Sequence, residues 1–193
     1  VSPPIPGIDL PGVTSCWTLA DARRIAATAK PGARVVLMGA GFIGCIILEA
    51  LAKSGATLTV VEMEGRMVPR MMNDTAGNMI KDWCQEHGVT VHTSTKVNAI
   101  EKHGNALRVV LNSGATVDVD LVVSATGVRP NIELVKDSGI ATDQGILVNR
   151  QMQTNDPSIF AAGDVAQGID FSTGEYSVQA IQPTAADHGQ LAA

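Results

Sequence analysis

One stretch constrains the fold of this chain most strongly, the apolar run Val35-Val36-Leu37-Met38 followed at once by Gly39-Ala40-Gly41-Phe42-Ile43-Gly44. Four apolar residues bounded by glycine are typical of a buried parallel strand. Residues 42–55 carry apolar side chains on almost every face and end at Gly55, which predicts a helix with a glycine cap. Residues 56–65 predict a second strand. This order of strand, turn, helix and strand predicts a βαβ unit in an α/β fold with a parallel sheet.

The turn has the spacing G-x-G-x-x-G, in which each glycine has its own physical role. Gly39 permits the tight turn, Gly41 lets the backbone approach a pyrophosphate, and Gly44 lets helix and strand pack closely. The helix N-terminus adds unpaired N–H groups and a positive partial charge. The motif alone also fits an ordinary glycine-rich corner, and the flanking strand and helix favour a nucleotide site. We therefore predict that Gly39, Gly41, Phe42, Ile43 and Gly44 bind a dinucleotide.

The acid at the end of the second strand indicates which dinucleotide is bound. Glu62 lies about 20 residues after Gly41, where a carboxylate can accept hydrogen bonds from the adenosine ribose hydroxyls. A carboxylate at this position repels a 2′-phosphate, so NAD(H) is favoured over NADP(H). Arg66 is the nearby cation that would favour NADP(H), although we interpret it as a solvated surface arginine.

Composition excludes several other classes of protein. The 193 residues are 45% hydrophobic and 17% charged, so the chain can bury a core and is not a disordered tail. No apolar run approaches the roughly 20 residues that a membrane helix needs. The net charge of −5, without a long basic block, argues against nucleic acid and anionic membranes as partners.

Cysteine and histidine positions predict neither a disulfide nor a metal site. The 3 cysteines are far apart and form no Cys-x-x-Cys pair, which fits a reducing cytoplasm. His87, His92 and His103 lie at no metal-ligand spacing to another His, Cys or acid. We interpret these three residues as surface or turn histidines, and we predict a cytoplasmic protein.

The middle of the chain alternates between one helix and several strands. Residues 73–88 predict a helix. Its predicted apolar face consists of Met79, Ile80, Trp83 and Cys84. Residues 89–104 are strand-like, and residues 105–127 hold two further strands joined by a hairpin at 112–114. These strands predict an antiparallel β-meander in addition to the parallel sheet.

Two further motifs come late in the chain. Ala125-Thr126-Gly127-Val128-Arg129-Pro130-Asn131 directly follows an apolar strand, and a strand-like segment at 158–162 leads into Gly163-Asp164. A ligand could approach the backbone at Gly163, and Asp164 would lie at the carboxyl end of a strand, where open α/β sheets bind ligands. The same residues fit a strand that ends in a simple turn, so the residues alone leave both interpretations open.

The order of the motifs G-x-G-x-x-G, A-T-G-x-x-P-N and T-x-x-x-x-I-F-A-A-G-D resembles the pyridine nucleotide-disulfide oxidoreductase superfamily. The similarity is greatest to the branch that includes ferredoxin and rubredoxin reductases, NADH oxidases and the flavin part of nitrite reductases. It extends over nearly the whole chain. The resemblance implies an FAD-dependent enzyme that passes hydride from NADH to FAD, in which the flavin carries the reaction.

The resemblance also implies roles for individual residues. Asp164, next to Gly163, would form a hydrogen bond to the ribityl chain of FAD. The closing segment, with Pro183, Thr184 and Ala185, would approach the flavin ring. Thr126 and Gly127 would contact NAD at the crossover between the nucleotide domains. No catalytic residue is assigned, because hydride transfer to a flavin requires no acid or base from the protein.

The chain departs from the family's pattern in two ways. The family has an earlier G-x-G-x-x-G for the ADP half of FAD, whereas this chain begins at Val1 and has the one motif at Gly39. We therefore expect a fragment that lacks the first FAD segment and the C-terminal domain. Many relatives also carry a glutamate near the nicotinamide where this chain has Ile46, and the nearest acid is Glu49.

From these motifs we expect three segments. Residues 1–30 would form a connector and lead-in helix, residues 31–147 a Rossmann-like NAD(H)-binding domain, and residues 148–193 the C-terminal part of an FAD-binding domain. We expect the fragment to be inactive alone and to form a homodimer through an exposed tail strand. The expected partners are NADH, FAD and a redox acceptor, either a small molecule or an electron-transfer protein.

Two other function classes are possible on the sequence. A short-chain dehydrogenase needs a Tyr-x-x-x-Lys pair, but Tyr176 is followed four residues later by Ala180. A non-catalytic NADH-binding module, either a sensor or an assembly part, would keep the same glycine motif. Such a module would have no use for Asp164, so FAD binding discriminates between the two.

Overall fold

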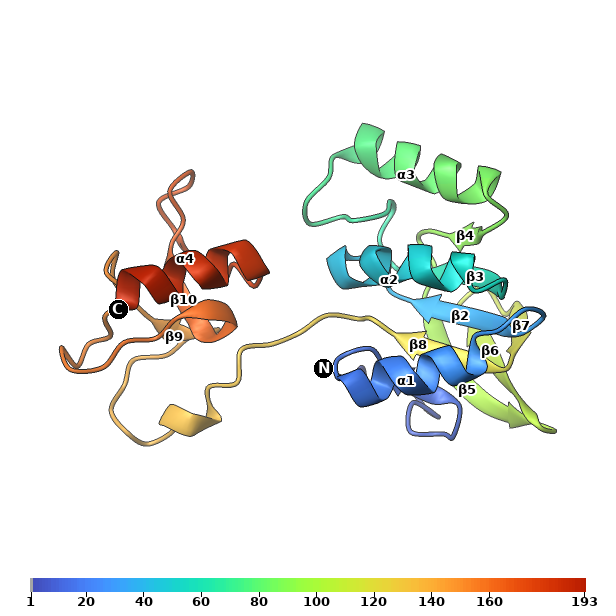
Figure 1. Cartoon of the computed structure of the whole chain (residues 1–193), viewed down its shortest axis with the longest axis horizontal. Helices are drawn as coiled ribbons and strands as arrows, with labels where there is room; N and C mark the ends of the chain where they lie inside the picture. Colours follow the sequence, from blue (N-terminus) through green and yellow to red (C-terminus); the bar gives the residue numbers. More distant parts are fainter. Residues whose placement is uncertain (1) are drawn as a thin grey trace. The chain divides into compact units, whose positions relative to one another are not determined.

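The computed structural model describes residues 2–193, and residue 1, at which the first predicted segment begins, lies outside the described residues. The chain divides into two compact units (Figure 1). The first unit ends at Gly127 and the second begins at Val128. The first unit contains the predicted βαβ motif, and the second contains the Gly-Asp motif.

A five-stranded parallel sheet forms the centre of the first unit. Its strand order is β1-β8-β2-β3-β4, and every neighbouring pair runs parallel. The strands are β1 (Val13–Ser15), β8 (Leu121–Ser124), β2 (Arg34–Met38), β3 (Thr57–Val61) and β4 (Thr90–His92). Val35 and Val36 point to opposite faces of the sheet and are both almost fully buried. Both faces are covered, which explains the continuous apolar runs and confirms the predicted α/β fold.

Three helices cover one face of this sheet. They are α1 (Leu19–Thr28), α2 (Phe42–Lys53) and α3 (Asp74–Glu86). Ile25 of α1, Leu48 of α2 and Cys84 of α3 belong to one apolar core together with Leu37 and Val60 of the sheet. The helix α2 follows β2 directly, so the glycine turn lies at the carboxyl edge of the sheet.

The predicted apolar face of α3 is wrong in half of its residues. Cys84 is buried and Ile80 packs against the core, but Met79 is 67% exposed and Trp83 is 50% exposed. The helix rests on the sheet through a narrow stripe, so Met79 and Trp83, each one position before a core residue and therefore rotated about 100° around the helix, point to solvent. The Trp83 ring instead stacks on the His87 ring, with their centroids 4.1 Å apart.

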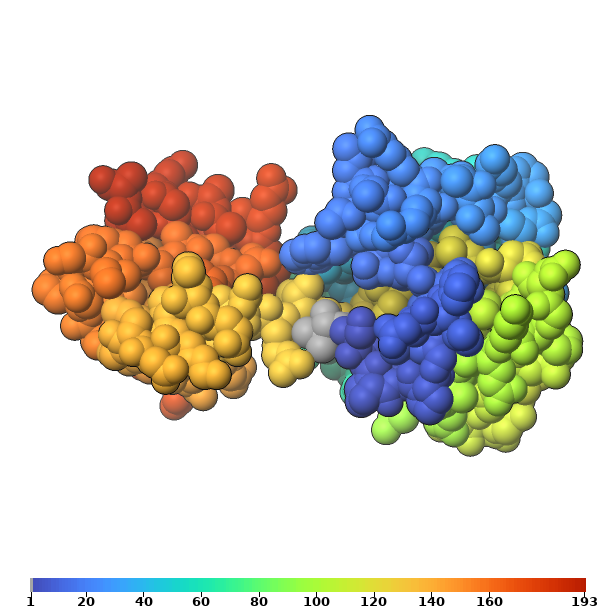
Figure 2. All heavy atoms as spheres, turned by 90° about the horizontal axis from the view of Figure 1, so that it is seen from below, coloured from blue at the N-terminus to red at the C-terminus, as the bar shows by residue number. Residues whose placement is uncertain are grey.

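The predicted antiparallel meander is present, and it covers the other face of the sheet. Its strands are β5 (Val97–His103), β6 (Ala106–Leu111) and β7 (Thr116–Val119). They form a second apolar core with Val36 and Met38 of β2. The N-terminal segment joins this core through Ile5 and Ile8, and Figure 2 shows it beside the meander. The third strand of residues 105–127, β8, belongs to the parallel sheet and not to the meander.

The second unit is built on a small three-stranded sheet with the order β11-β10-β9. Its elements are η1 (Glu133–Val135), β9 (Ile146–Leu147), η2 (Gly163–Val165), β10 (Ala166–Ile169), β11 (Tyr176–Ser177) and α4 (Gln182–Ala192). Its core contains Ile146, Val148, Met152, Ala161 and Ala166.

The strand predicted at residues 158–162 is wrong. Phe160 forms a single antiparallel bridge with Gln153, because the Ile159 N–H donates to Asp156 and closes a tight turn. The strand follows the Gly-Asp motif instead, as β10, and it is paired on both sides. The edges of this small sheet are therefore the two-residue strands β9 and β11, not a long unpaired tail strand.

The two units do not coincide with the predicted segment boundaries at residues 30 and 147. The first segment contains a helix, α1, which packs on the main core, and a strand, β1, which pairs with β8. Residues 128–147 belong to the second unit, where Ile132 and Val135 pack against the core around Ile146. Both departures from the predicted boundaries arise because residues far apart in the sequence pair or pack together.

The cysteines of the described chain are free thiols in apolar surroundings. Cys16 and Cys45 are partly buried and Cys84 is buried. Burial raises the pKa of the Cys45 thiol to about 11, so the thiol stays protonated and weakly reactive at neutral pH. Among residues 2–193, no helix combines the length and the apolar character needed to span a bilayer.

Asp21 stabilises the start of α1, and its ionisation should make the fold sensitive to acid. Its carboxylate accepts hydrogen bonds from the backbone N–H groups of Thr18 and Trp17 at 2.8 and 3.0 Å, and it also contacts Arg24. The bond from Thr18 and then that from Trp17 hold the pKa of Asp21 at about 2. Because this pKa is lowered on folding, the stabilisation is present above about pH 4 and is lost as pH falls toward 2.

We therefore expect the melting temperature to fall between about pH 4 and pH 2, and to fall less in Asp21→Asn. Thermal melts followed by circular dichroism over this range measure the effect. Asp82→Asn, on the exposed side of α3, is the matched control and should follow the unaltered chain. Identical pH profiles for Asp21→Asn and the unaltered chain would contradict this account of Asp21.

Candidate nucleotide-binding site

The turn between β2 and α2 requires glycine at its first and last motif positions. Gly39 has a φ of +96°, and a Cβ there would lie 2.6 Å from the carbonyl oxygen of Ala125. A Cβ on Gly44 would lie 2.2 Å from the carbonyl oxygen of Gly39. Both contacts are shorter than any real Cβ contact, so these two glycines are required for the packing of turn, helix and sheet.

Gly41 differs from the other two motif glycines. It is the N-cap residue of α2, with an ordinary φ of −73°, and no side chain caps the helix there. A Cβ built on Gly41 meets no atom within 4 Å. The fold therefore does not require glycine at this position, and the space beside it is open to a ligand. The first N–H groups of α2 have no partner within the helix and can donate to an anion.

Glu62 joins the end of β3 to the glycine turn. Its side chain is buried, and its carboxylate accepts hydrogen bonds from the N–H groups of Ala40 at 2.6 Å and of Glu64 at 2.9 Å. The bond to Ala40, inside the motif, is a role that the sequence did not predict. Each carboxylate oxygen has a second acceptor position, so these bonds are compatible with the predicted bonds to ribose hydroxyls.

Thr126 and Gly127 lie next to the glycine turn, although they are far from it in the sequence. Their strand, β8, pairs with β2, so that Ser124 lies opposite Met38. A Cβ on Gly39 would lie 3.4 Å from the Cα of Thr126. Gly127 has a φ of +106°, and a Cβ built on it would meet no atom within 4 Å. The predicted NAD residues of β2, β3 and β8 are thus gathered at one edge of the sheet.

The interpretation of Arg66 as a solvated arginine is wrong. Its guanidinium forms an ion pair with Asp74 at 2.9 Å and donates to the carbonyl oxygens of Met72 and Pro69 at 2.7 and 2.9 Å. These bonds hold the loop between β3 and α3 together. Most donors of Arg66 are therefore engaged within its own loop, which leaves little capacity for a 2′-phosphate.

The Gly-Asp motif of the second unit lies against the first two turns of α4. Gly163, with a φ of +75°, donates its N–H to Nδ1 of His188 at 3.3 Å, and a Cβ on it would lie 3.5 Å from the Cβ of Ala185. The structure thus brings Gly163 and Asp164 together with Thr184 and Ala185. Asp164 is exposed and its carboxylate forms no hydrogen bond with the described residues. His188 has no signal in the sequence that would predict this role, because it is an isolated histidine on a helix.

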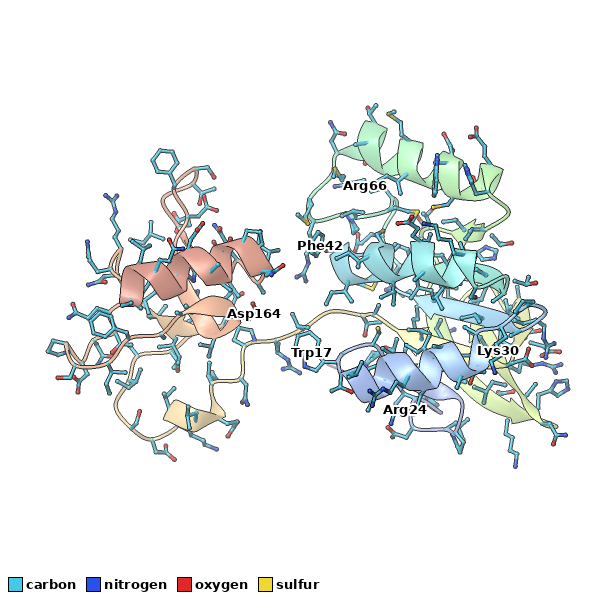
Figure 3. The ribbon with its side chains drawn as sticks, viewed as in Figure 1. Trp17, Arg24, Lys30, Phe42, Arg66 and Asp164 are labelled. Atoms are coloured by element: carbon cyan, nitrogen blue, oxygen red, sulfur yellow. The ribbon has the colours of Figure 1, made fainter. Side chains whose placement is uncertain are left out.

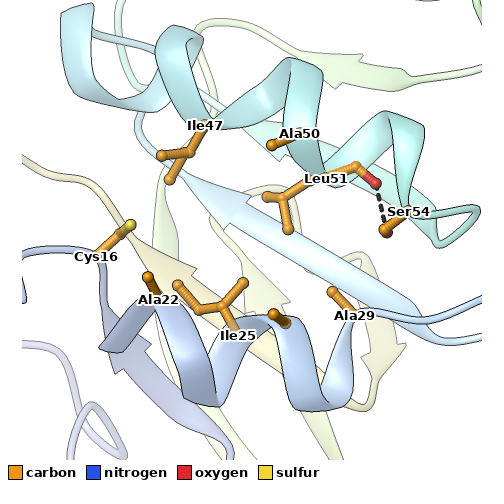
Figure 4. A pocket seen from close by; sticks show the side chains of 9 residues that line it. Cys16, Ala22, Ile25, Ala29, Ile47, Ala50, Leu51 and Ser54 are labelled. Atoms are coloured by element: carbon orange, nitrogen blue, oxygen red, sulfur yellow. Dashed lines mark hydrogen bonds between the residues drawn. The ribbon is translucent and has the colours of Figure 1, made fainter. Parts of the chain in front are cut away.

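An apolar cavity of about 320 Å³ lies between α1 and α2 (Figure 4). Its walls are mainly small apolar side chains such as Ala22, Ala50 and Leu51, and the Ser54 hydroxyl at one end donates to the carbonyl oxygen of Leu51. The residues that line the cavity include no cation and no residue of the glycine turn, so the cavity is separate from that turn. Within residues 2–193, no three His, Cys, Asp or Glu side chains cluster as metal ligands.

Comparison with known proteins identifies the family. The model of the family described as pyridine nucleotide-disulphide oxidoreductase matches residues 1–188. The chain belongs to this family. The predicted family and its oxidoreductase class are thereby confirmed.

The relatives that match this chain are longer proteins. It is 35% identical over 190 residues to the epsilon subunit of NADH-dependent phenylglyoxylate dehydrogenase from Aromatoleum evansii, covering 98% of this chain and 45% of the relative. It is also 35% identical to the NADH oxidase of Methanocaldococcus jannaschii, covering 98% of this chain and 43% of the relative. The chain therefore spans less than half the length of these pyridine nucleotide-disulphide oxidoreductases.

A solved structure of the family has the same fold. The NAD-dependent persulfide reductase from A. fulgidus superposes with a TM-score of 0.94 at 33% identity, covering 100% of this chain and 36% of that protein. In this chain, Ile46 lies on α2, and its side chain is 60% exposed. The resemblance implied a glutamate at this position in many relatives, and the nearest acid in the sequence, Glu49, is paired with Lys53.

Proposed function

We propose that this chain is the NAD(H)-binding portion of an FAD-dependent oxidoreductase, which passes hydride from NADH to FAD and then to an acceptor that we do not identify. One observation carries the proposal. In the glycine turn the outer glycines are required by packing, whereas Gly41 has nothing within 4 Å of its Cβ position. The open space at Gly41 lies beside the N-terminus of α2, where a pyrophosphate can bind.

The residues around the turn have distinct tasks in this proposal. The N–H groups at the start of α2, from Phe42 to Gly44, donate to the pyrophosphate. Glu62 accepts from the adenosine ribose and at the same time orients the turn through its bond to Ala40. Thr126 and Gly127 support the nicotinamide half. When bound, FAD supplies the electron-accepting ring, and the protein needs to provide only position and surroundings.

The second unit would supply part of the FAD site. Gly163 allows close backbone approach, the free carboxylate of Asp164 can accept from a ribityl hydroxyl, and the start of α4 at Thr184 and Ala185 lies beside them. We also propose that the protein is cytoplasmic and that it binds neither nucleic acid nor a membrane. A homodimer, if it forms through the second unit, would use the short edges β9 or β11.

Cofactor choice tests this function. We expect NADH to bind more tightly than NADPH, because Glu62 would face the 2′-phosphate with like charge. The names of the relatives, an NADH oxidase and an NADH-dependent dehydrogenase, support the same choice. Glu62→Ala should weaken NADH binding by about 1–2 kcal/mol, the value of a lost charge-assisted hydrogen bond.

Calorimetric titration with NADH and NADPH measures both effects. Glu64→Ala is the matched control, because only its backbone N–H, and not its exposed side chain, contacts Glu62. It should bind NADH as the unaltered chain does. If the unaltered chain bound NADPH as tightly as NADH, or bound neither, the proposed role of Glu62 would be untenable.

A further inference from the structure

Trp17 lies at the same edge of the sheet as the glycine turn. It follows β1, in which Ser15 pairs with Ser124 of β8, and Ser124 in turn pairs with Met38 of β2. Trp17, Thr126 and Ala40 each follow one of these paired residues by two positions, so they lie just beyond the ends of β1, β8 and β2. Figure 3 shows Trp17 and Phe42 at the same end of the first unit, at the starts of α1 and α2.

The backbone of Trp17 is fixed while its ring is left free. Its N–H donates to Oδ2 of Asp21 at 3.0 Å, and the capping box between Thr18 and Asp21 holds the next residue. The indole is nevertheless 64% exposed, so the core does not use it. A large aromatic side chain presented from a fixed backbone costs little entropy when it binds a ligand.

The direction of a bound dinucleotide follows from the proposed function. Glu62, directly after β3, lies on one side of β2 and takes the adenosine, and the turn after β2 takes the pyrophosphate. The nicotinamide half must then extend to the other side, across β8 toward β1. Neighbouring strands lie about 4.8 Å apart, so β1 is about 10 Å from β2. The nicotinamide riboside can span this distance.

We propose that Trp17 contacts the nicotinamide end of the dinucleotide, with its indole against the nicotinamide ring. The inference rests on the proposed function and adds to it a residue that positions the reactive ring. The dihydronicotinamide ring of NADH is nearly planar but not aromatic, so we take the value for a pair of stacked rings, about 0.5–1.5 kcal/mol or about threefold to tenfold in affinity, as the scale of the contact. The contact depends only on an exposed aromatic side chain just after β1, which Trp17 provides.

Comparing two ligands tests the contact. ADP-ribose keeps the adenosine and the pyrophosphate of NADH but lacks the nicotinamide. We expect Trp17→Ala to bind NADH about threefold to tenfold more weakly by calorimetry, and to bind ADP-ribose within about twofold of the unaltered chain. Trp17→Phe, which retains an aromatic ring, should recover most of the NADH affinity.

The chain offers a matched control, because its other tryptophan, Trp83, is also half exposed but lies on α3. Trp83→Ala should bind both ligands normally. Equal losses for NADH and ADP-ribose in Trp17→Ala, or no loss for NADH, would overturn the inference while leaving the proposed function intact. If the unaltered chain bound neither ligand, the proposed function would fail, and this inference would fail with it.

Discussion

Gly41→Val should abolish binding of NADH, with a loss of at least about 100-fold in affinity, or about 3 kcal/mol. The branched side chain would occupy the space beside the start of α2 that the pyrophosphate requires. The same substitution should leave the fold almost unchanged, because Gly41 has an ordinary φ of −73° and its Cβ position has no neighbour within 4 Å. Calorimetry with NADH and a thermal melt measure the two outcomes.

Gly39→Ala gives the opposite pattern and serves as the control. Its Cβ would lie 2.6 Å from the carbonyl oxygen of Ala125, and its φ of +96° is strained for any L side chain. We expect it to destabilise the fold by about 1–3 kcal/mol. The pair therefore separates a glycine that serves the ligand from one that serves the fold. Normal NADH binding by Gly41→Val would mean that the motif is only a structural corner.

The 193-residue chain should bind FAD no more tightly than about millimolar and should be colourless when purified. The residues that would hold the ribityl chain and flavin ring lie together in the second unit, but residues 1–193 contain one G-x-G-x-x-G, which we assign to NADH. One hydrogen bond to Asp164 contributes about 1–3 kcal/mol, whereas micromolar binding needs about 8 kcal/mol.

The measurement is to add FAD to the purified chain, dialyse it, and record the visible spectrum. NADH titration of the same preparation is the control, since the glycine turn, Glu62 and Thr126 all lie within the first unit. NADH binding without retained flavin is the expected result. Flavin absorbance retained at near-stoichiometric yield would show that the residues assigned to the FAD site are incomplete.

The sequence by itself determined the parts of this protein that depend on local chemistry. The apolar run at Val35, the glycine spacing and the acid at Glu62 predict a βαβ unit, because strand burial, turn conformation and helix start are all set within a few residues. The order of the three motifs was enough to predict the family, which the family match over residues 1–188 confirms. The resemblance also named Thr126 and Asp164, and their roles stay predictions.

The tertiary structure alone decided which distant segments meet. Strand pairing places β8 between β1 and β2, and this brings Thr126 next to the turn at Gly39 and Trp17 to the same edge of the sheet. The bond from Ala40 to Glu62 and that from Gly163 to His188 likewise join segments more than 20 residues apart. The exposure of Trp83 likewise depends on which side of α3 rests on the sheet. Local preferences along a chain are weak, and packing against distant segments overrides them because it buries far more apolar surface.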